Sequence, residues 1–325
     1  MDKKYDIAAV GESLIDFVTT DSGAKDKITM EGNAGGAVAN VLAMGAKLGG
    51  KTALISKVGQ DAFGDFLVRN IKDSGVDTSA MVRGKELTTL AVVTLDATGN
   101  RSFSFYRNQT ADVMLQVSEL DNGVLEGCRI MHFGSVSMVA QPARTATLEA
   151  VRRAKKAGAK ISFDPNYRAF LWSSEEEAIA AMREGMELAD YVKVADEEAL
   201  MLTGEADPEK AALVLQTQYR LAFAAVTLGP KGCVGIAPTA RMRHAAYDLP
   251  CVNTTGAGDA FWGAVLYQLL QLGGADIGAA EMETLLAWGN AAGSLVTTAH
   301  GAIAPQPTRA QIEKCIKETP FYNAE

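Results

Sequence analysis

The spacing of hydrophobic residues predicts a chain in which short buried strands alternate with amphipathic helices. Strand-length runs of β-branched and aliphatic residues occupy positions 5–10, 52–58, 129–133, 159–163, 191–194 and 221–228. Segments with apolar residues at every third or fourth position lie between them, at 36–48, 61–73, 142–157, 175–188 and 208–219. This alternation predicts a three-layer α/β/α fold with a mostly parallel central sheet, which binds ligands beyond the carboxyl ends of its strands.

Two segments break the alternation. Residues 90–95 and 102–106 are strand-like and flank Asp96–Arg101, a turn rich in Gly, Asn and Asp, so we expect a β-hairpin. Residues 11–30 also alternate without helical periodicity. Together these segments are expected either to form a small β-sheet lid over the strand ends or to extend the main sheet. The first alternative divides the chain into a large α/β domain that binds nucleotide and sugar (1–11, 31–88 and 110–325) and a β lid (12–30 and 89–109).

The overall charge limits the classes of partner. The 325 residues carry a formal net charge of -8, with a pI near 5.1. Clustered Lys and Arg are needed to neutralise the phosphates of nucleic acids or lipids, so neither kind of partner is expected. The N-terminus has no hydrophobic signal region and no apolar run is long enough to cross a bilayer, which predicts a cytoplasmic protein. The four cysteines are scattered, without the spacing of zinc ligands.

The segment Gly45–Thr52 matches the phosphate-loop pattern G-x-x-x-x-G-K-T, but its context is reversed. A phosphate loop follows a strand and opens a helix, whereas here a helical pattern precedes the motif and a strand follows it. Gly49 and Gly50 are therefore expected to end a helix rather than to hold a phosphate.

A second glycine-rich segment, Asn253–Asp259, comes directly before the apolar helical pattern at 260–270. Small residues at the start of a helix leave backbone N–H groups uncovered, and these groups form an anion site. Asp259 lies within that site, where a carboxylate can accept the proton of an alcohol. The segment therefore indicates phosphoryl transfer to a hydroxyl group. The alternative is a glycine-rich turn with an acidic residue favoured by the helix dipole.

Three stretches together carry a resemblance to a known family. Gly35–Asn40 opens a predicted helix, Lys57–Gly64 follows later, and Thr254–Asp259 ends the series. In this order they strongly resemble the ribokinase-like (PfkB) carbohydrate kinases, and the resemblance runs from Val10 to about Thr308. It implies a ribokinase-like fold and an ATP-dependent kinase that phosphorylates a sugar.

Further stretches make the chain most similar to the fructokinases of that family. They are Gly11–Phe17, Phe105–Arg107, Asp164–Arg168 and Gly301–Ile303. The expected reaction transfers the γ-phosphoryl group of ATP to the 6-hydroxyl of D-fructose. A 2-keto-3-deoxygluconate kinase or another ribokinase-like sugar or nucleoside kinase stays open, because an Arg near a sugar can also bind a carboxylate. A third alternative, of another class, is a catalytically inactive sugar-binding regulatory relative.

The resemblance also implies roles for individual residues. Asp259 is the expected general base, and Gly256, Ala257 and Gly258 are the expected anion hole for the transferred phosphoryl group. The residues expected to bind the sugar are Asp16, Gly35, Gly36, Asn40, Arg107 and Asn166, with Arg168 as a further candidate.

The nucleotide and ion sites follow from the same resemblance. ATP is expected at Lys193, Thr227, Gly229, Gly232, Gly258 and Asn290, and Mg2+ at Glu198 through water. A monovalent cation such as potassium (K+) is expected near Asn253, Thr255 and Gly301. Asn253 replaces the usual Asp, which weakens the expected cation site, and Ala195 stands where Asn is usual. A homodimer through exposed edge strands of the lid is also expected.

Overall fold

The chain folds around two β-sheets. The computed structural model describes residues 3–20, 27–95 and 101–323. With η for 3-10 helices, the elements are β1 Tyr5–Val10, β2 Leu14–Thr20, β3 Thr29–Gly35, α1 Ala37–Lys47, β4 Thr52–Gly59, α2 Ala62–Asp73, β5 Met81–Gly84, β6 Thr89–Leu95, β7 Arg101–Tyr106, η1 Val117–Glu119, α3 Asn122–Gly127, β8 Cys128–Gly134, η2 Val136–Met138, α4 Ala143–Lys156, β9 Lys160–Asp164, η3 Ala169–Leu171, α5 Glu175–Leu188, β10 Tyr191–Ala195, α6 Asp196–Thr203, α7 Pro208–Tyr219, β11 Phe223–Thr227, η4 Gly229–Lys231, β12 Cys233–Ala237, β13 Ala240–His244, α8 Ala257–Gln271, α9 Ala279–Val296 and α10 Arg309–Glu318.

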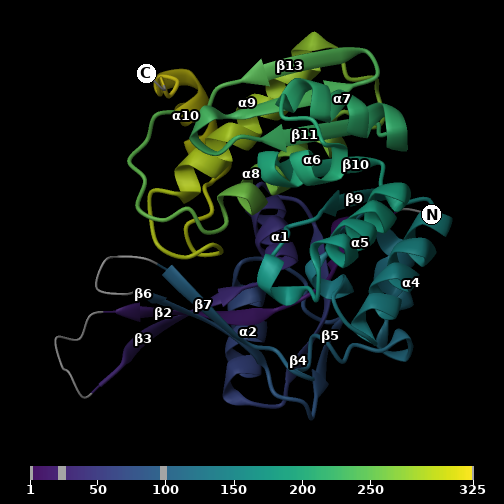
Figure 1. Cartoon of the computed structure of the whole chain (residues 1–325), viewed down its shortest axis with the longest axis vertical. Helices are drawn as coiled ribbons and strands as arrows, with labels where there is room; N and C mark the ends of the chain where they lie inside the picture. Colours follow the sequence, from purple (N-terminus) through teal and green to yellow (C-terminus); the bar gives the residue numbers. More distant parts are fainter. Residues whose placement is uncertain (1–2, 21–26, 96–100, 324–325) are drawn as a thin grey trace.

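In the described residues, the large sheet has the strand order β13-β12-β11-β10-β9-β8-β1-β4-β5. The strands from β11 to β5 pair in parallel, and β12 and β13 add an antiparallel edge. Successive side chains alternate between the faces. In β1, Ala8 and Val10 belong to the core under α4–α7, whereas Ile7 and Ala9 belong to the core under α1, α2, α8 and α9. The predicted α/β/α fold with a mostly parallel sheet is confirmed (Figure 1).

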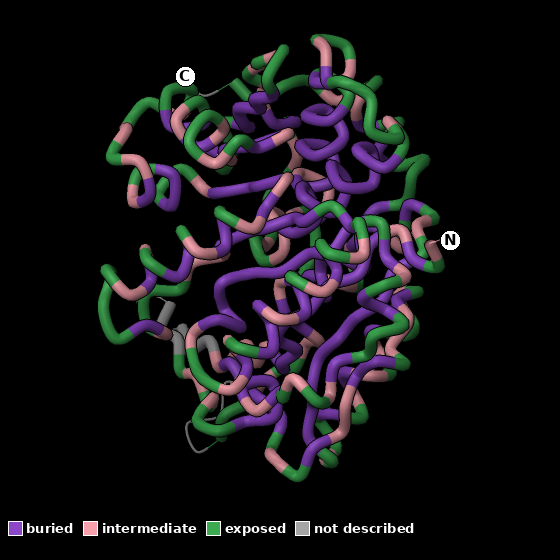
Figure 2. The backbone as a smooth tube through the Cα atoms, turned by 90° about the vertical axis from the view of Figure 1, so that its right-hand side faces the viewer, coloured by how far each residue is buried: buried purple, intermediate pink, exposed green. Residues whose placement is uncertain are grey.

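The two cores enclose the backbone of the central strands. Figure 2 shows buried backbone running through the middle of the molecule and exposed backbone at the outer turns. The carboxyl ends of the parallel strands therefore open at one edge of a rigid interior, where polar side chains can be held in place.

Helices α1 and α8 approach one another closely within this architecture. A Cβ on Gly263 of α8 would stand 2.6 Å from the Cβ of Met44 and 2.6 Å from the carbonyl oxygen of Val41 in α1. Any side chain at position 263 would push the two helices apart, so Gly263 sets their separation. The contact matters for the site because α1 carries Asn40 and α8 carries Asp259.

The segment that matches a phosphate loop is a helix end, as predicted. α1 ends at Lys47, Gly49 has a φ of 98°, and β4 begins at Thr52. No helix starts at this motif in the described chain, so its N–H groups do not form a phosphate cradle.

The second sheet has four strands in the order β3-β2-β6-β7. β6 and β7 pair antiparallel, as a hairpin requires, and β2 pairs with β3 antiparallel and with β6 parallel. These segments therefore form a small sheet and do not extend the large one. Residues 96–100 of the predicted turn, and residues 21–26, lie outside the described residues. β3 continues past Met30 to Gly35 and crosses the expected boundary, so the division into domains stays a prediction.

One face of the small sheet lies toward the segment that follows β9 of the large sheet. Asp16 lies opposite Asn33 and Ala91, and Ala91 lies opposite Phe105, so these side chains share a face. The ring centroid of Phe105 is 4.9 Å from that of Phe170 in η3. The small sheet therefore contacts the segment that follows β9, at the carboxyl edge of the large sheet.

Candidate active site

The glycine-rich segment before α8 folds as an uncovered helix start. Gly256 is the N-cap residue with a φ of 79°, a left-handed conformation that favours glycine, and no described side chain caps the helix. A Cβ on Gly256 would also stand 2.6 Å from the Cβ of Ala302. First-turn N–H groups have no carbonyl partner within a helix and carry the positive end of its dipole. The N–H of Ala257 donates to the carbonyl of Thr254 at 3.2 Å, so its predicted part in the anion hole is not supported. The N–H groups of Gly256, Gly258 and Asp259 have no backbone acceptor in the described residues, and the geometry around them is suited to an anion.

Asp259 lies in this first turn and is 8% exposed. Asn40 of α1 donates from Nδ2 to Asp259 Oδ2 at 2.8 Å. Burial raises the pKa of Asp259 to about 6, with the Asp164 carboxylate adding to the shift and the Asn40 hydrogen bond and Lys193 opposing it. A carboxylate with this pKa is ionised at neutral pH and is more basic than an ordinary Asp, as a general base requires.

The start of α1 is capped by a distant residue. Gly36 is the N-cap, with a φ of 121°, and Glu12 Oε1 accepts the N–H of Ala37 at 2.9 Å. Burial raises the pKa of Glu12 to about 7, against the opposing Arg107 guanidinium. Three buried oxygens lack a hydrogen-bond partner in the described part of the chain near this helix start: Glu12 Oε2, Ser13 Oγ and Asn40 Oδ1. Unpartnered buried oxygens of this kind are expected to bind a polar ligand.

We expect Glu12→Gln to stabilise the protein at alkaline pH. The folded pKa of Glu12 is about 7 against an ordinary 4.5, so its ionisation costs folding free energy as the pH rises through this range, and the full cost is present above pH 7. The neutral amide avoids that cost, which is on the order of 3 kcal/mol. Urea unfolding at a series of pH values should show the variant gaining stability over the wild type as the pH rises. A difference that is constant with pH would contradict this expectation.

Asp16 approaches the same place from the small sheet. Burial raises its pKa to about 6; the Arg168 guanidinium opposes the shift and the Asp259 carboxylate adds to it. Both influences require that these side chains lie near Asp16. A Cβ on Gly35 would overlap the Asp16 carboxylate, so glycine allows this close approach. The structure thus brings Asp16, Gly35 and Asp259 together with the start of α1.

Two neighbouring strand ends supply a buried ion pair beside α8. Lys193 Nζ of β10 lies 2.8 Å from Asp164 Oδ2 of β9, with side chains 7% and 3% exposed. A Cβ on Gly258 would stand 3.0 Å from Lys193 Nζ, so the ammonium group lies against the first turn of α8. Burial alone lowers the pKa of Lys193, but the carboxylates of Asp164 and Glu198 outweigh it and the pKa lies above its ordinary value. Protonated Lys193 adds a positive charge to the anion site.

Glu198 lies in the first turn of α6, and both its oxygens accept backbone N–H groups. Oε1 accepts from Tyr167 and Oε2 accepts from Ala195, each at 2.7 Å. Burial raises the pKa of Glu198, and Lys193 opposes the shift. Across residues 3–20, 27–95 and 101–323, no group of three or more His, Cys, Asp or Glu side chains could hold a metal ion. Both oxygens of Glu198 are already bonded to the backbone, so a Mg2+ near Glu198 would have to be held largely by its own water and phosphate ligands, and this contact stays a prediction.

The residues predicted for ATP follow the adjacent strand. Thr227 ends β11 opposite Ala195 of β10, and the turn with Gly229 and Gly232 comes directly after it. Because β10 also carries Lys193, the predicted nucleotide residues lie at neighbouring strand ends beside the anion site. Their contact with ATP stays a prediction.

Two further residues that were predicted to bind sugar or ATP donate their hydrogen bonds to other protein groups. Arg107 donates from Nε to Asp112 Oδ2 at 2.8 Å and from Nη2 to the carbonyl of Val136 at 3.0 Å, and its side chain is 7% exposed. Asn290 donates from Nδ2 to the carbonyl of His244 at 3.0 Å. In this conformation these atoms stabilise the scaffold, and the roles of Arg107 in sugar binding and of Asn290 in ATP binding stay predictions.

The segment after β9 carries the remaining sugar candidates. Asn166 has a φ of 48° and donates its N–H to Asp164 Oδ1 at 3.2 Å. Arg168 is exposed and influences both Asp16 and Asp259 electrostatically. This segment therefore lies at the mouth of the site, between the small sheet and α8.

In the predicted cation loop, one candidate oxygen already accepts a hydrogen bond from the loop itself. Asn253 Oδ1 accepts the N–H of Thr255 at 2.8 Å, which turns the chain into α8. Gly301 has a φ of 90°, and the next residue, Ala302, packs against Gly256. The two segments lie side by side as the cation prediction requires, but the only side-chain oxygen of Asn253 already accepts a hydrogen bond.

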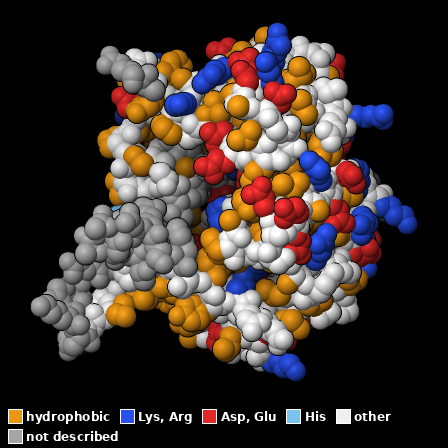
Figure 3. Space-filling model, viewed as in Figure 1, with side chains coloured by type: hydrophobic (Ala, Val, Ile, Leu, Met, Phe, Trp, Pro, Cys, Tyr) orange, Lys and Arg blue, Asp and Glu red, His pale blue; other side chains and the backbone are white. Residues whose placement is uncertain are grey.

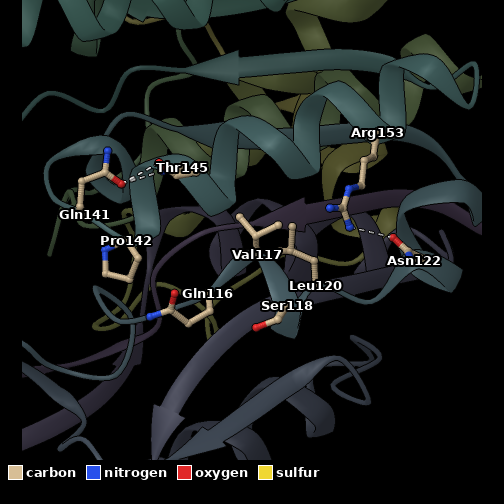
Figure 4. A pocket seen from close by; sticks show the side chains of 9 residues that line it. All are labelled: Gln116, Val117, Ser118, Leu120, Asn122, Gln141, Pro142, Thr145 and Arg153. Atoms are coloured by element: carbon tan, nitrogen blue, oxygen red, sulfur yellow. Dashed lines mark hydrogen bonds between the residues drawn. The ribbon is translucent and has the colours of Figure 1, made fainter.

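A groove between η1 and α4 lacks the buried charged groups of the site described above. On the face drawn in Figure 3, Lys and Arg side chains are interspersed with Asp and Glu. The groove between η1 and α4 has a volume of about 800 Å³. Its polar side chains form hydrogen bonds with one another, Thr145 with Gln141 and Arg153 with Asn122 (Figure 4). None of the predicted site residues lines it. No helix within the described ranges is long and apolar enough to cross a membrane.

Two residues that shape the site had no individual role in the sequence prediction. Asp164, which pairs with Lys193, follows a buried strand, and a polar residue at a strand's carboxyl end is a usable signal. Glu12 caps a helix that begins 25 residues later, at Ala37. No spacing rule within the sequence reveals such a contact.

Comparison with known proteins gives a consistent result. Residues 4–309 match the model of the pfkB family of carbohydrate kinases. The chain is 40% identical over 315 residues to probable fructokinase-5 of Arabidopsis thaliana, covering 96% of this chain and 97% of that protein. It superposes on the ATP-bound fructokinase of Xylella fastidiosa with a TM-score of 0.86 at 32% identity, covering 96% and 98% of the two chains. A double mutant of the Vibrio cholerae O395 fructokinase with fructose, ADP and a potassium ion gives a TM-score of 0.85 at 30% identity, covering 97% and 99%.

Proposed function

The chain belongs to the pfkB family of carbohydrate kinases, and from this premise we propose that it is a fructokinase that phosphorylates the 6-hydroxyl of D-fructose with ATP. The observation that carries the proposal is the position of Asp259: a buried, basic carboxylate in the first turn of α8, hydrogen-bonded to Asn40 and close to Lys193. Similarity to relatives solved with ATP, and with fructose and ADP, supports the choice of substrates.

In the proposed reaction, Asp259 accepts the proton of the sugar hydroxyl while the oxygen attacks the γ-phosphorus of ATP. The new P–O bond forms as the bond to the ADP oxygen breaks. The N–H groups at Gly258 and Asp259, together with Lys193, stabilise the charge on the transferred group. Mg2+, held through water near Glu198, would neutralise phosphate charge when bound.

The sugar is proposed to bind between the small sheet and the start of α1. Asp16 can accept hydrogen bonds from sugar hydroxyl groups there, and the unpartnered oxygens of Asn40 and Ser13 can also bind hydroxyl groups. Asp16 shares its face of the sheet with Phe105, which contacts Phe170. We propose that the small sheet acts as a lid in this position and excludes water, which would otherwise compete for the phosphoryl group.

We expect turnover to fall at acidic pH. Asp259 must be ionised to accept a proton, and its pKa is about 6, so kcat/KM should decline as the pH drops through 6. Asp16, with the same pKa, sharpens the decline. A pH–rate profile with saturating ATP measures this directly. An acidic limb near the ordinary Asp value of 3.8 would contradict the role of Asp259.

The proposal is tested by ADP release from the purified protein with fructose, ribose, 2-keto-3-deoxygluconate and nucleosides. Fructose is expected to give the highest kcat/KM. Preference for the keto acid would favour the 2-keto-3-deoxygluconate kinase, which Arg168 at the mouth of the site could serve by binding a carboxylate. No turnover with any substrate would favour the inactive sugar-binding relative.

Parallel assays with and without K+ test the cation loop, where Asn253 predicts a weak dependence. Analytical ultracentrifugation tests the homodimer.

A further inference from the structure

A buried hydrogen-bond chain ties α8 to the central sheet. Trp262 of α8 donates from Nε1 to Ser162 Oγ of β9 at 2.8 Å, and Ser162 Oγ lies 2.9 Å from Nδ1 of His132 in β8. None of the three side chains is more than 1% exposed. Burial lowers the pKa of His132 to about 4, so the imidazole is neutral and adds no charge beneath the helix.

Strand register places this chain next to the ion pair of the active site. His132, Ser162, Tyr191 and Phe223 lie opposite one another on four successive strands and share the face under α8. The Trp262 ring stacks on that of Phe223, with centroids 6.1 Å apart and planes at 11°. Two residues after Ser162, on the same face of β9, comes Asp164, the partner of Lys193.

Most of the other buried side chains of α8 are apolar. Two are polar: Asp259, whose hydrogen bond with Asn40 joins α8 to α1, and Gln268. Phe261, Val265, Leu266 and Leu269 belong to the core below the helix. Apolar burial is non-directional and permits small shifts and rotations, whereas a hydrogen bond restricts both distance and angle. Trp262 comes three residues after Asp259, so the indole N–H and the carboxylate move together on one turn of the helix.

We propose that the Trp262–Ser162–His132 chain fixes α8 on the sheet at the position that aligns Asp259 for proton transfer, which makes Trp262 and Ser162 positioning residues of the reaction. The inference rests on the proposed kinase function. A displacement of about 1 Å at the reacting groups costs about 10²-fold in rate. Loss of the hydrogen bond should therefore lower kcat far more than it changes KM, because neither residue contacts the sugar or ATP sites described above.

The test compares Trp262→Phe, Ser162→Ala and the double variant with the wild type. Trp262→Phe keeps a ring on Phe223 but removes the donor, and Ser162→Ala removes the acceptor with little change in volume. Trp288→Phe, in α9, is the matched control for loss of an indole. We expect each single variant to lose about 10- to 100-fold in kcat with KM within about two-fold, and the double variant to lose no more than the worse single variant. The acidic limb of the pH–rate profile should move to lower pH as Asp259 gains solvent.

Thermal unfolding first establishes that the variants are folded; if Trp262→Phe is not, Ser162→Ala decides alone. A kcat within about five-fold of the wild type, additive losses in the double variant, or an equal loss in Trp288→Phe overturns the inference. A wild type without turnover on any sugar overturns the proposed function instead, so the two failures are distinguishable.

Discussion

Replacing Asp259 with Asn is expected to abolish turnover and to raise the stability of the fold. The amide cannot accept the hydroxyl proton, and loss of a positioned base lowers rates by roughly 10² to 10⁴. The pKa of Asp259 is about 6 against an ordinary 3.8, so its ionisation at neutral pH costs folding free energy on the order of 2–3 kcal/mol. Asn keeps a carbonyl oxygen that can accept from Asn40. The kcat and the midpoint of thermal unfolding should therefore move in opposite directions.

An acid outside the site provides the control for this substitution. Asp276 is exposed between α8 and α9, and Asp276→Asn should change neither kcat nor the unfolding midpoint. If Asp259→Asn lost stability together with turnover, the carboxylate would be a structural element of the α1–α8 contact. The role of general base would then lose its support.

Lys193→Met is expected to impair both folding and phosphoryl transfer. The substitution leaves Asp164 buried without its cation, and breaking a buried pair from one side costs about 3–5 kcal/mol. It also removes the positive charge that lies against Gly258, where the transferred phosphoryl group is proposed to bind. Urea unfolding and kcat measurements should show both losses.

A double variant separates the two effects. Adding Asp164→Asn to Lys193→Met removes the unpaired charge, so stability should recover in large part, while turnover should stay low because the cation is still missing. Recovery of turnover in the double variant would mean that Lys193 supports the fold and has no part in the reaction. Lys193→Arg is a poor substitute, since the planar guanidinium does not fit the space of an ammonium group.

The fold was predictable from periodicity wherever a strand or helix is long and buried. β1 was predicted with the bounds observed because it is a short, mostly apolar run, and α5 likewise because its buried residues recur at every third or fourth position. β13 was missed because only five residues form it and, at the edge of the sheet, none of them is fully buried. α6 was missed because only eight residues form it and its first turn is acidic. Short helices and edge strands are stabilised by contacts with neighbouring elements, and sequence periodicity does not reveal those contacts.

The site was predictable as a set of segments and not as a set of contacts. The glycine-rich start of α8 and the position of Asp259 follow from local helix geometry. The Asn40–Asp259 hydrogen bond joins residues 219 positions apart, and the Asp164–Lys193 pair depends on β9 and β10 being neighbours. Arg107 was predicted as a sugar ligand from its position near the end of a hairpin. That position did not reveal that its guanidinium donates to the buried carboxylate of Asp112.

The close contact of α1 and α8 has a consequence for how such an enzyme can be altered. The proposed sugar ligands Asp16, Gly35, Gly36 and Asn40 all lie between positions 16 and 40, far along the sequence from Lys193 and the α8 segment. A gene chimera could therefore import this part of a relative's sugar site, without the candidates Arg107, Asn166 and Arg168, and keep its own phosphate chemistry. The imported helix must fit against Gly263, which leaves no room for a side chain between the two helices. A recombinant whose α1 does not fit against Gly263 is therefore expected to fail in folding, whichever sugar its site could bind.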